Sequence, residues 1–351
     1  MGSNVDLSVI VPCYNTERFV DQALGSVEQS GRCRMEVIVL DDGSTDGSLG
    51  IMRAHAARDA RIHVVQKSNE GYGATVNRGL DMARGTYVAV LEPDDWIVCG
   101  GYDDLLDLAQ ATGMPDVVKS SYWRILSNGT SDVTRAHGYL YHRVKTAGVP
   151  MRLEDEPQLI QYHPSIWSGI YRADFLREHG IRMLEVPGAG WVDNPFCVHT
   201  LAAARSIVYT DDPFYCYRED LASASSARAS AQLMVDRWND REDVLDGLGV
   251  TDDGIRTANC IVGLRFLSQH VDGEDESLFA PMARRMNPDL VAGVTCIAPH
   301  VVNRCLELAG SDLRAPASHH YKAHLAYEAW WALVNNGPAF LAHNLMLARG
   351  R

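Results

Sequence analysis

Acidic and aromatic side chains follow three short apolar runs in the first hundred residues. The polar clusters are Pro12-Cys13-Tyr14-Asn15 after Leu7–Val11, Asp41-Asp42-Gly43-Ser44-Thr45-Asp46 after Val37–Leu40, and Glu92-Pro93-Asp94-Asp95 after Val88–Leu91. If the runs are parallel strands, the clusters converge, because ligands of open parallel sheets bind outside the carboxyl ends of the strands. Carboxylates gathered there repel one another unless a divalent cation binds between them. Such oxygen ligands suit Mg²⁺ or Mn²⁺, which commonly neutralise phosphates.

Other phosphate-binding devices are absent from the sequence. No Gly-x-Gly-x-x-Gly follows the first apolar run, and there is no Gly-x-x-x-x-Gly-Lys-Ser/Thr, which argues against dinucleotide dehydrogenases and P-loop enzymes. Taken singly, Asp42–Gly47 also suits a turn with a helix N-cap, and Asp94-Asp95 suits a helix start favoured by the helix dipole. Their joint placement after separate strands favours a shared site.

The apolar pattern predicts an α/β fold in the first 120 residues. Strands are predicted at Leu7–Pro12, Met35–Leu40, Ile62–Gln66, Tyr87–Leu91 and Val117–Val118. Helical periodicity lies between them, at 19–27 and at 75–83, with Gly85 as the expected C-cap of the second helix. Nearly continuous apolar strands separated by helices indicate a mostly parallel central sheet with helices on both faces.

The α/β region is predicted to continue to residue 225. Its later elements are a hairpin at Asn128-Gly129, a polar loop at Glu154–Pro157, a strand at Ile166–Tyr171, a helix from Asp174 to Gly180, a glycine-rich turn at Pro187–Gly190, a helix through Phe196–Leu201, and a strand from Ile207 to Tyr209 or Tyr217. Strand signals then vanish, and apolar residues recur at helical spacing. We therefore expect an α/β domain at 1–225 and a C-terminal helical domain at 226–351.

Composition excludes several classes of partner. The 351 residues carry 32 Lys and Arg against 45 Asp and Glu, a net charge of −13, so neither nucleic acid nor an anionic membrane surface is an expected partner from the overall charge. No apolar run approaches the roughly 18 residues that a transmembrane segment needs. Eight scattered cysteines without Cys-x-x-Cys spacing indicate reduced thiols, and no signal peptide is recognised. We therefore expect a cytoplasmic protein.

The motifs together resemble those of inverting glycosyltransferases of family 2, which have the GT-A fold. The matching segments are Ser8–Asn15, Val39–Ser48, Asn77–Gly85, Val90–Trp96 and Gly190–Phe196. They run in the family's order and spacing through the first 220 residues, and the C-terminal third lies outside the pattern. The resemblance implies a GT-A domain with a mostly parallel sheet, and the helical region after it is predicted from the apolar spacing alone.

Position by position, the resemblance implies a nucleotide-binding site. Pro12 and Tyr14 would flank the base, with Asn15 beside them. Asp42 would accept a hydrogen bond from the base, as in uracil-reading members of the family. Asp94 would lie near the ribose or the sugar.

The resemblance also implies two residues that act in the reaction. Asp95 would bind the Mn²⁺ or Mg²⁺ that bridges the diphosphate and assists its departure. Asp193 would be the general base that takes the proton of the acceptor hydroxyl, in a single displacement that inverts the anomeric centre. Glu92 departs from the family, which commonly has Asp there, and its extra methylene can shift a contact.

Four residues are further candidates for contacts with the diphosphate or the acceptor: Glu92, Trp167, Trp191 and Arg218. Arg218 ends a segment that resembles the family, although a surface ion pair is an alternative. Trp167 could offer a face for a sugar to stack on, with buried packing as the alternative.

The function implied by the resemblance is transfer of a sugar from a nucleotide sugar, with a uridine diphosphate sugar favoured. The acceptor would be a saccharide or a lipid-linked saccharide in cell-surface polysaccharide assembly. Two alternatives stay open. A sugar-1-phosphate nucleotidyltransferase should have a glycine-rich basic loop where Pro12–Asn15 stands. The other alternative is a non-catalytic saccharide- or nucleotide-binding protein with a decayed site, and the only residue that favours it is Glu92.

The C-terminal segment carries two weaker signals. His320, His324 and Glu328 are spaced as zinc ligands on one helix face, but no cysteine or catalytic motif accompanies them. The apolar stretch Ala329–Leu347 suits packing on the α/β domain, pairing in a homodimer, or peripheral contact with the inner face of the membrane.

Overall fold

The computed structural model describes residues 5–126, 134–219, 230–271 and 273–349. They divide into two compact units. The first unit lies within Met1–Ile125, Gly138–Glu156 and Pro164–Leu221, and the second within Leu126–His137, Pro157–His163 and Ala222–Arg351. The hairpin predicted at Asn128-Gly129 and the boundary predicted after residue 225 both fall outside the described residues. The division into domains 1–225 and 226–351 therefore stays a prediction.

One sheet organises the first unit, in the strand order β3-β2-β1-β4-β8-β6-β9-β5. The strands are β1 (Leu7–Cys13), β2 (Met35–Asp41), β3 (Ile62–Gln66), β4 (Tyr87–Val90), β5 (Trp96–Ile97), β6 (Val117–Leu126), β8 (Gly169–Arg172) and β9 (Ile207–Arg218). Strands β3, β2, β1 and β4 are parallel, with Cys13 of β1 opposite Asp41 of β2. Every residue of β1 and β2 is buried, as expected for parallel strands covered on both faces. The predicted α/β sheet is confirmed.

The other half of the sheet is mixed. Strand β8 runs antiparallel to both β4 and β6, and β9 runs parallel to β6 but antiparallel to β5. Strand β8 begins at Gly169 rather than at the predicted Ile166, because the preceding residues form a turn. In that turn the backbone N–H and the hydroxyl of Ser168 both donate to the carbonyl oxygen of Ser165, at 2.9 and 2.8 Å.

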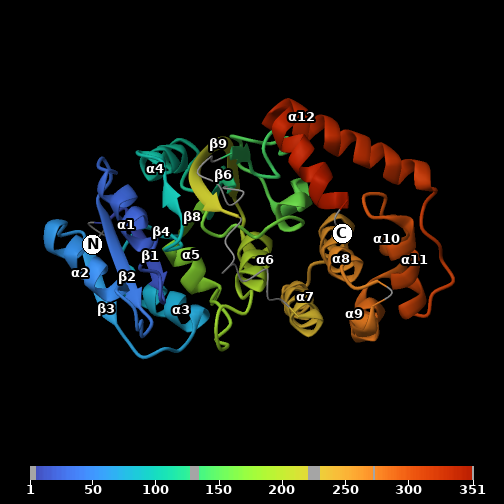
Figure 1. Ribbon diagram of the computed structural model, residues 1–351, viewed down its shortest axis with the longest axis horizontal. Coiled ribbons are helices and arrows are strands. Elements are labelled where there is room, and N and C mark those ends of the chain that lie inside the picture. The colour runs from blue at the N-terminus through green and yellow to red at the C-terminus, as the bar shows by residue number, and fades with distance from the viewer. Residues whose placement is uncertain (1–4, 127–133, 220–229, 272, 350–351) are drawn as a thin grey trace. The chain divides into compact units, whose positions relative to one another are not determined.

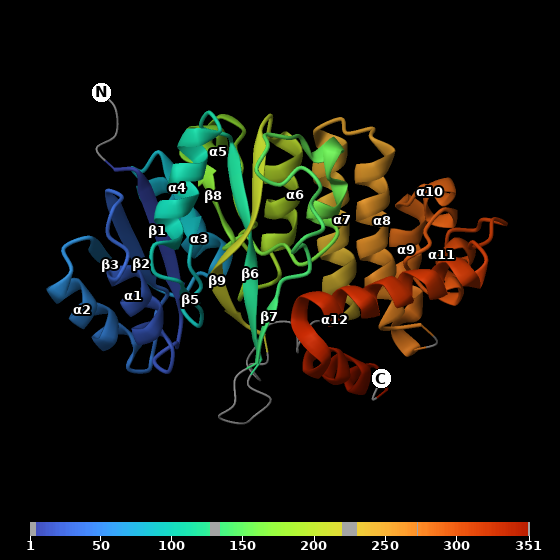
Figure 2. The same ribbon diagram turned by 90° about the horizontal axis from the view of Figure 1, so that it is seen from above.

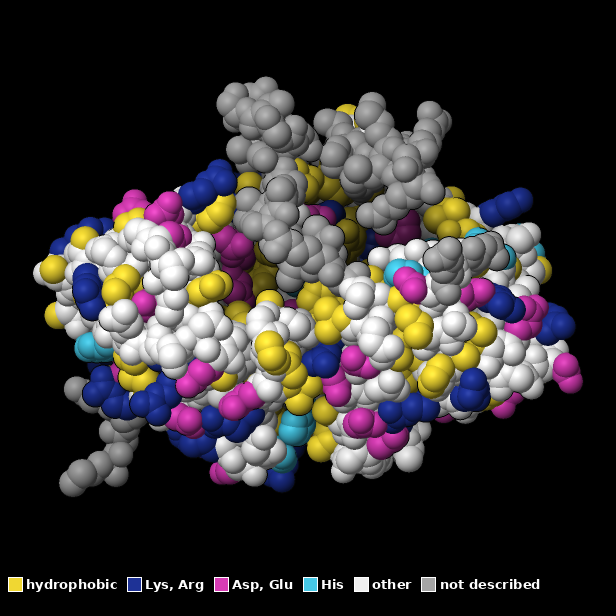
Figure 3. Space-filling model, turned by 60° about the horizontal axis from the view of Figure 1, so that its bottom comes forward, with side chains coloured by type: hydrophobic (Ala, Val, Ile, Leu, Met, Phe, Trp, Pro, Cys, Tyr) yellow, Lys and Arg dark blue, Asp and Glu magenta, His cyan; other side chains and the backbone are white. Residues whose placement is uncertain are grey.

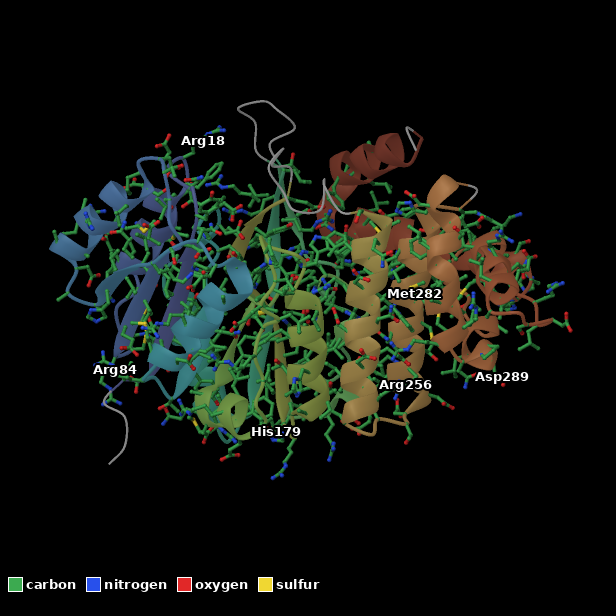
Figure 4. All side chains as sticks on the ribbon, turned by 90° about the horizontal axis from the view of Figure 1, so that it is seen from below. Arg18, Arg84, His179, Arg256, Met282 and Asp289 are labelled. Carbon is green, nitrogen blue, oxygen red and sulfur yellow. The ribbon has the colours of Figure 1, made fainter. Side chains whose placement is uncertain are left out.

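Helices cover both faces of this sheet (Figure 1). They are α1 (Val20–Glu28), α2 (Ser48–Arg58), α3 (Tyr72–Met82), α4 (Gly101–Ala111), α5 (Ala173–Glu178) and α6 (Asp193–Ala203). Helices α1 and α3 lie on opposite faces (Figures 1 and 2). Arg18, just after β1, and Arg84, just before β4, mark opposite ends of the parallel strands (Figure 4). The strand ends near Arg18 are the ones that carry the acidic clusters.

The second unit is built from helices. They are α7 (Ala231–Gly247), α8 (Asp253–Ser268), α9 (Ala280–Arg285), α10 (Pro288–Ala292), α11 (Pro299–Leu308) and α12 (Ser318–Arg349), with the short strand β7 (Thr134–His137) and a 3-10 turn at Pro157–Ile160. That turn and another at Leu153–Asp155 replace the loop predicted at Glu154–Pro157. Trp238, Leu264 and Phe279 are fully buried in the core. In the described ranges, no helix is both long enough and apolar enough to cross a bilayer.

A buried polar network joins the amino ends of three parallel strands. The Ser8 hydroxyl donates to Glu36 Oε1 at 2.5 Å, and the Arg84 backbone N–H and Nε donate to the two Glu36 oxygens, each at 2.8 Å. Burial opposes ionisation of Glu36, but the hydrogen bonds from Ser8 and Arg84 outweigh it and lower the pKa of Glu36 below its ordinary value of 4.5. The ionised carboxylate therefore stabilises the fold.

This network gives a pH-dependent prediction. Because the folded pKa of Glu36 lies below the unfolded value, its contribution is present above about pH 4.5 and is lost as the pH falls through the folded pKa. We expect Glu36→Gln to lower the free energy of unfolding at pH 7 by about 1–3 kcal/mol, and to differ less from wild type at pH ~3. Urea titrations measure both values. The exposed control Glu178→Gln should change stability by less than about 0.5 kcal/mol, and an equal Glu36 effect at both pH values would contradict the prediction.

Candidate active site

The acidic clusters at the ends of β2 and β4 converge around the thiol of Cys13 at the end of β1. Cys13 ends β1 beside Asp41, which ends β2. Burial raises the pKa of the Cys13 thiol, and the charges of Asp41, Glu92 and Asp94 raise it further. Since charges from the ends of β2 and β4 act on one side chain of β1, the three strand ends meet as expected. Figure 3 shows acidic side chains gathered at a hollow in the surface, beside hydrophobic ones.

Asp42 is the buried anchor of the loop that leads to α3. Its carboxylate accepts hydrogen bonds from Lys67 Nζ, from the Glu70 backbone N–H at 2.9 Å and from the Gly71 backbone N–H at 3.0 Å. Lys67 also pairs with the exposed carboxylate of Glu70 at 3.0 Å. The sequence singled out Asp42 but not Lys67, because only the fold brings residue 67 beside residue 42.

The predicted nucleotide residues after β1 differ in accessibility. Pro12 is buried within β1, whereas Tyr14 is 51% exposed and therefore open to a ligand. Asn15 adopts a left-handed backbone conformation and joins the loops after β1 and β2. Its backbone N–H donates to Ser44 Oγ at 3.0 Å, and its side-chain oxygen accepts from the Thr45 backbone N–H at 2.8 Å. Asn15 thus shapes the loop from which Tyr14 projects.

Glu92 lies against a tyrosine that the sequence analysis did not identify. The hydroxyl of Tyr72, the first residue of α3, donates to Glu92 Oε1 at 2.5 Å. Burial raises the pKa of Glu92 to about 8, and the negative charges of Asp94 and Asp193 contribute to that rise. The longer Glu92 side chain is therefore held within the acidic cluster. The only sequence signal for Tyr72 was its place after Gly71 at a helix start.

Asp94 and Asp95 differ in what they offer to a ligand. Asp95 is 1% exposed; its Oδ1 accepts from the Arg218 backbone N–H at 2.8 Å, and its Oδ2 has no hydrogen-bond partner within the described ranges. Asp94 is only partly buried. Burial raises the pKa of both carboxyls, and for Asp95 the charge of Asp94 adds to the effect.

These residues fit a divalent cation. Burial disfavours the ionised forms of Glu92, Asp94 and Asp95, and the charge of Asp94 adds to this effect at Glu92 and Asp95. The buried Asp95 Oδ2 atom makes no hydrogen bond of ordinary geometry in the described residues, although the Tyr215 hydroxyl acts on the Asp95 carboxyl and opposes the rise of its pKa. A cation would supply the missing positive charge. The described residues contain no group of three His, Cys, Asp or Glu side chains arranged as metal ligands. Mg²⁺ is commonly held by one or two carboxylates together with substrate phosphates.

Arg218 is fixed beside these carboxylates. Its Nε donates to the Asp94 backbone oxygen at 2.5 Å, and its guanidinium lies 4.5 Å from the ring centre of Trp96 and 5.1 Å from that of Phe19. Gln22 accepts a further hydrogen bond from this guanidinium. These contacts, rather than the surface ion pair considered as the alternative, hold Arg218 at the side of the acidic cluster.

Trp167 is packed among tyrosines instead of presenting an open face. It is 4% exposed, and its ring stacks on Tyr215 and Tyr217 at centroid distances of 4.3 and 4.9 Å. The sugar-stacking role considered for Trp167 is therefore not supported, and buried packing describes it. Tyr217 is less buried, and the charges of Asp95, Asp94 and Asp193 all act on its hydroxyl. Tyr217, which the sequence analysis did not single out, is thus a partly exposed aromatic residue close to the acids.

Asp193 begins α6 and faces the same cluster. Its charge acts on the side chains of Glu92, Tyr72 and Tyr217. The amino end of a helix favours a carboxylate, because the helix dipole is positive there. Trp191, two residues earlier, has a φ of 53°, a left-handed conformation that costs energy for a bulky residue. The turn that aims Asp193 is therefore held by its surroundings.

Helix α3 holds the segment that leads to Asp193. The buried side chain of Asn77 donates to the Met183 backbone oxygen at 3.0 Å and accepts from the Met183 N–H at 2.9 Å. The Tyr72 N–H donates to the Gly188 oxygen at 3.0 Å. A Cβ on Gly73 would lie 2.0 Å from the Leu184 oxygen, so only glycine allows this approach. The resulting link explains the glycine between Tyr72 and Asn77.

The predicted zinc spacing on α12 does not form a metal site in the described residues. His324 pairs with Glu328 at 4.0 Å. His320 does not form a group of three metal ligands with them in the part of the chain that the structure covers.

The first unit matches a known protein family. Residues 8–162 fit the family described as Glycosyl transferase family 2. These residues belong to glycosyl transferase family 2. The resemblance inferred from the motifs is confirmed, and the match spans all three acidic strand ends.

Relatives of this family 2 domain include a protein of Bacillus subtilis (strain 168) named uncharacterized glycosyltransferase EpsJ. It is 28% identical over 225 residues, which cover 61% of this chain and 61% of EpsJ. A putative glycosyltransferase of the same organism, EpsH, is 27% identical over 62% of each chain. The chain thus spans less than two thirds of the length of these curated relatives.

Solved structures share the fold beyond the family 2 domain. S. aureus TarS 1-349, crystallised with UDP-GlcNAc, superposes with a TM-score of 0.70 over 92% of this chain and 91% of that chain, at 19% identity. The mannosyltransferase PcManGT from Pyrobaculum calidifontis, solved with GDP-Man and Mn²⁺, gives a TM-score of 0.50 over 88% of both chains at 14% identity. At these identities the likeness establishes the fold, which is GT-A with helices beyond the core.

The Asp42 contacts give a prediction about stability. Asp42→Ala would leave the Lys67 ammonium and two backbone N–H groups without their buried acceptor, so we expect a loss of about 2–4 kcal/mol in the free energy of unfolding. Glu70→Ala removes the other carboxylate that contacts Lys67, but this one is exposed, and the expected loss is below about 1 kcal/mol. Urea denaturation compares the two variants. Equal losses would show that Asp42 does not anchor the loop.

Proposed function

We propose that the protein transfers a sugar from a nucleotide sugar, with a uridine diphosphate sugar favoured, to a saccharide or lipid-linked saccharide acceptor. The observation that carries this proposal is the approach of Asp193 to the buried cluster of Glu92, Asp94 and Asp95, whose pKa values burial raises. Such a cluster is suited to a cation bound together with a phosphate-bearing ligand, and Asp193 adds a base beside it. Membership of residues 8–162 in family 2 supports the same reaction class.

The nucleotide part of the proposal rests on the loops after β1 and β2. Tyr14 offers an exposed ring that can stack on a base, and Asn15 fixes the loop that carries it. We assign the base-reading hydrogen bond to Asp42, as the family motif implies, with the loop at 67–71 held against it. TarS was crystallised with UDP-GlcNAc and with UDP, which supports uracil, whereas PcManGT was solved with GDP-Man.

A divalent cation, Mn²⁺ or Mg²⁺, completes the proposed site. Asp95, through its unpartnered Oδ2, and the more open Asp94 would hold it. When bound, the cation would act as a Lewis acid on the diphosphate leaving group. Glu92 and Tyr72, joined by a hydrogen bond, would lie beside these ligands. Arg218 holds the backbone of Asp94 through a hydrogen bond to its carbonyl oxygen.

Asp193 is the proposed general base. An acceptor hydroxyl lying against Asp193 would give its proton to the carboxylate as its oxygen attacks the anomeric carbon. The new carbon–oxygen bond forms on one face while the bond to the diphosphate breaks on the other, so the configuration inverts. The fixed turn at Trp191 and the link from α3 hold the Asp193 carboxylate in place for this transfer. We place the reaction in polysaccharide or glycolipid assembly on the cytoplasmic side; the eight cysteines, all free thiols, are in keeping with that location.

A binding experiment tests the nucleotide and the metal together. We expect uridine diphosphate with Mn²⁺ to raise the unfolding temperature more than guanosine, thymidine or cytidine diphosphate, and chelation to remove the effect. A ligand at 100 times its Kd adds about 2.7 kcal/mol, which is several degrees for a chain of this size. No shift with any nucleotide would favour the decayed binding protein, and a preference for another base would overturn the uridine assignment.

The role of Asp193 is tested by Asp193→Asn, which keeps the shape of the side chain but cannot accept the proton. We expect the rate of sugar transfer to an acceptor, followed as release of the nucleoside diphosphate, to fall by about 10²–10⁴-fold, with binding of uridine diphosphate retained. Asp174→Asn is the matched control, because Asp174 also lies in the first turn of a helix but outside the site. Unchanged turnover in Asp193→Asn would exclude Asp193 as the base.

A further inference from the structure

The first half of α12 presents an apolar face to solvent. Five large hydrophobic residues are exposed within ten positions, Leu325, Tyr327, Trp330, Leu333 and Val334, with Trp330 at 57% and Val334 at 61%. At 100° per residue they fall on one side of the helix, and Ala323, Ala326 and Ala329 lie between them. This outer face of α12, from Ala323 to Val334, is the reverse of an ordinary surface helix, whose polar residues face water.

The opposite side of α12 is anchored within the second unit, so the outer face is not exposed by fraying. Trp331, Ala332 and Phe340 are buried. The side-chain oxygen of Asn336 accepts a hydrogen bond from the His137 N–H of β7 at 2.6 Å. The helix then bends at Gly337, where φ is 80°, before Pro338 (Figures 1 and 2). The inner side therefore fixes which residues point outward.

The charge of this helix differs from that of the whole chain. The chain has a net charge of −13, yet no exposed residue between His319 and Val334 is acidic in the described structure. Glu328 is the single carboxylate of α12, and it lies on the half-buried side, paired with His324. The exposed residues at the amino end of the face are instead His319, His320 and Lys322. The face is thus apolar, with one exposed lysine, Lys322, and two exposed histidines at its amino end.

We propose that the outer face of α12 docks on an anionic lipid surface, lying along the bilayer with its apolar residues among the acyl chains and Lys322 among the headgroups. Aromatic and aliphatic residues on one helix face, with Lys at its border, are the features of helices that bind at the membrane interface. Lys322 is exposed and no exposed acidic residue lies between His319 and Val334 in the described structure, so this part of an otherwise acidic chain does not repel an anionic lipid surface. The proposal is independent of the proposed reaction, although it would bring a lipid-linked acceptor near.

Sedimentation with lipid vesicles tests this docking on the full chain, without nucleotide or acceptor. The wild type should bind vesicles of phosphatidylcholine with phosphatidylglycerol, and bind pure phosphatidylcholine more weakly. Trp330→Glu combined with Val334→Glu should weaken binding at least about tenfold, because both charges would enter the apolar layer. Leu248→Glu is the matched control, since Leu248 is an exposed leucine of the same unit outside α12, and it should bind as the wild type does.

Two further measurements keep the test decisive. If the double variant does not fold, the blue shift of tryptophan emission on adding anionic vesicles should be reduced in Trp330→Phe, whose ring still fills the position. Light scattering in the absence of lipid reports the oligomeric state. Absence of binding to anionic vesicles, or equal binding by the double variant, would overturn the proposal. A dimer that Val334→Glu dissociates would assign the face to a second copy of the chain instead.

Discussion

The site depends on one electrostatic constraint, the burial of several carboxylates at the ends of three neighbouring strands. Glu92, Asp94 and Asp95 follow β4, and Asp41 ends β2 with Asp42 directly after it. Charges from both groups act on the Cys13 thiol at the end of β1 and raise its pKa. Burial raises the pKa of Glu92 to about 8 and raises those of Asp94 and Asp95 as well. Ionised carboxylates in such a place are stabilised by positive charge, and in the proposed function a divalent cation with a diphosphate ligand would supply it.

The rest of the first unit serves to hold this cluster and to bring a base to it. The parallel register places Cys13 beside Asp41, so the strand ends are level. Helix α3 joins two parts of the site, because Tyr72 donates to Glu92 while Asn77 holds Met183 in the segment leading to Asp193. Helix α3 thus positions residues on both sides of the site, through buried hydrogen bonds and close backbone contacts. A change in α3 should therefore affect both sides.

The sequence predicted the parts of the fold that short-range patterns specify. The strands β1 and β2 were predicted because buried parallel strands are almost continuously apolar, and Asp193 because it belongs to a recognisable motif. Residues whose role depends on distant contacts were missed. Lys67 matters because it reaches Asp42, and Tyr72 because it reaches Glu92. The strand β8 begins at Gly169 because Ser165 and Ser168 form a turn before it. Trp167 is buried because its ring stacks on Tyr215 of β9. The periodicity of the sequence shows neither contact. The structure also gives the second unit the described residues 134–137 and 157–163, which lie far before it in the chain.

The central claim is that these carboxylates bind one divalent cation together with a nucleoside diphosphate. Electron paramagnetic resonance of Mn²⁺ measures this directly, because bound ions lose the signal of the free ion. We predict that the wild type binds Mn²⁺ in the presence of uridine diphosphate, that Asp94→Asn combined with Asp95→Asn abolishes this binding, and that Asp104→Asn, an exposed aspartate of α4, does not. Binding that survives the double substitution, or no binding by the wild type with the nucleotide present, would contradict the account.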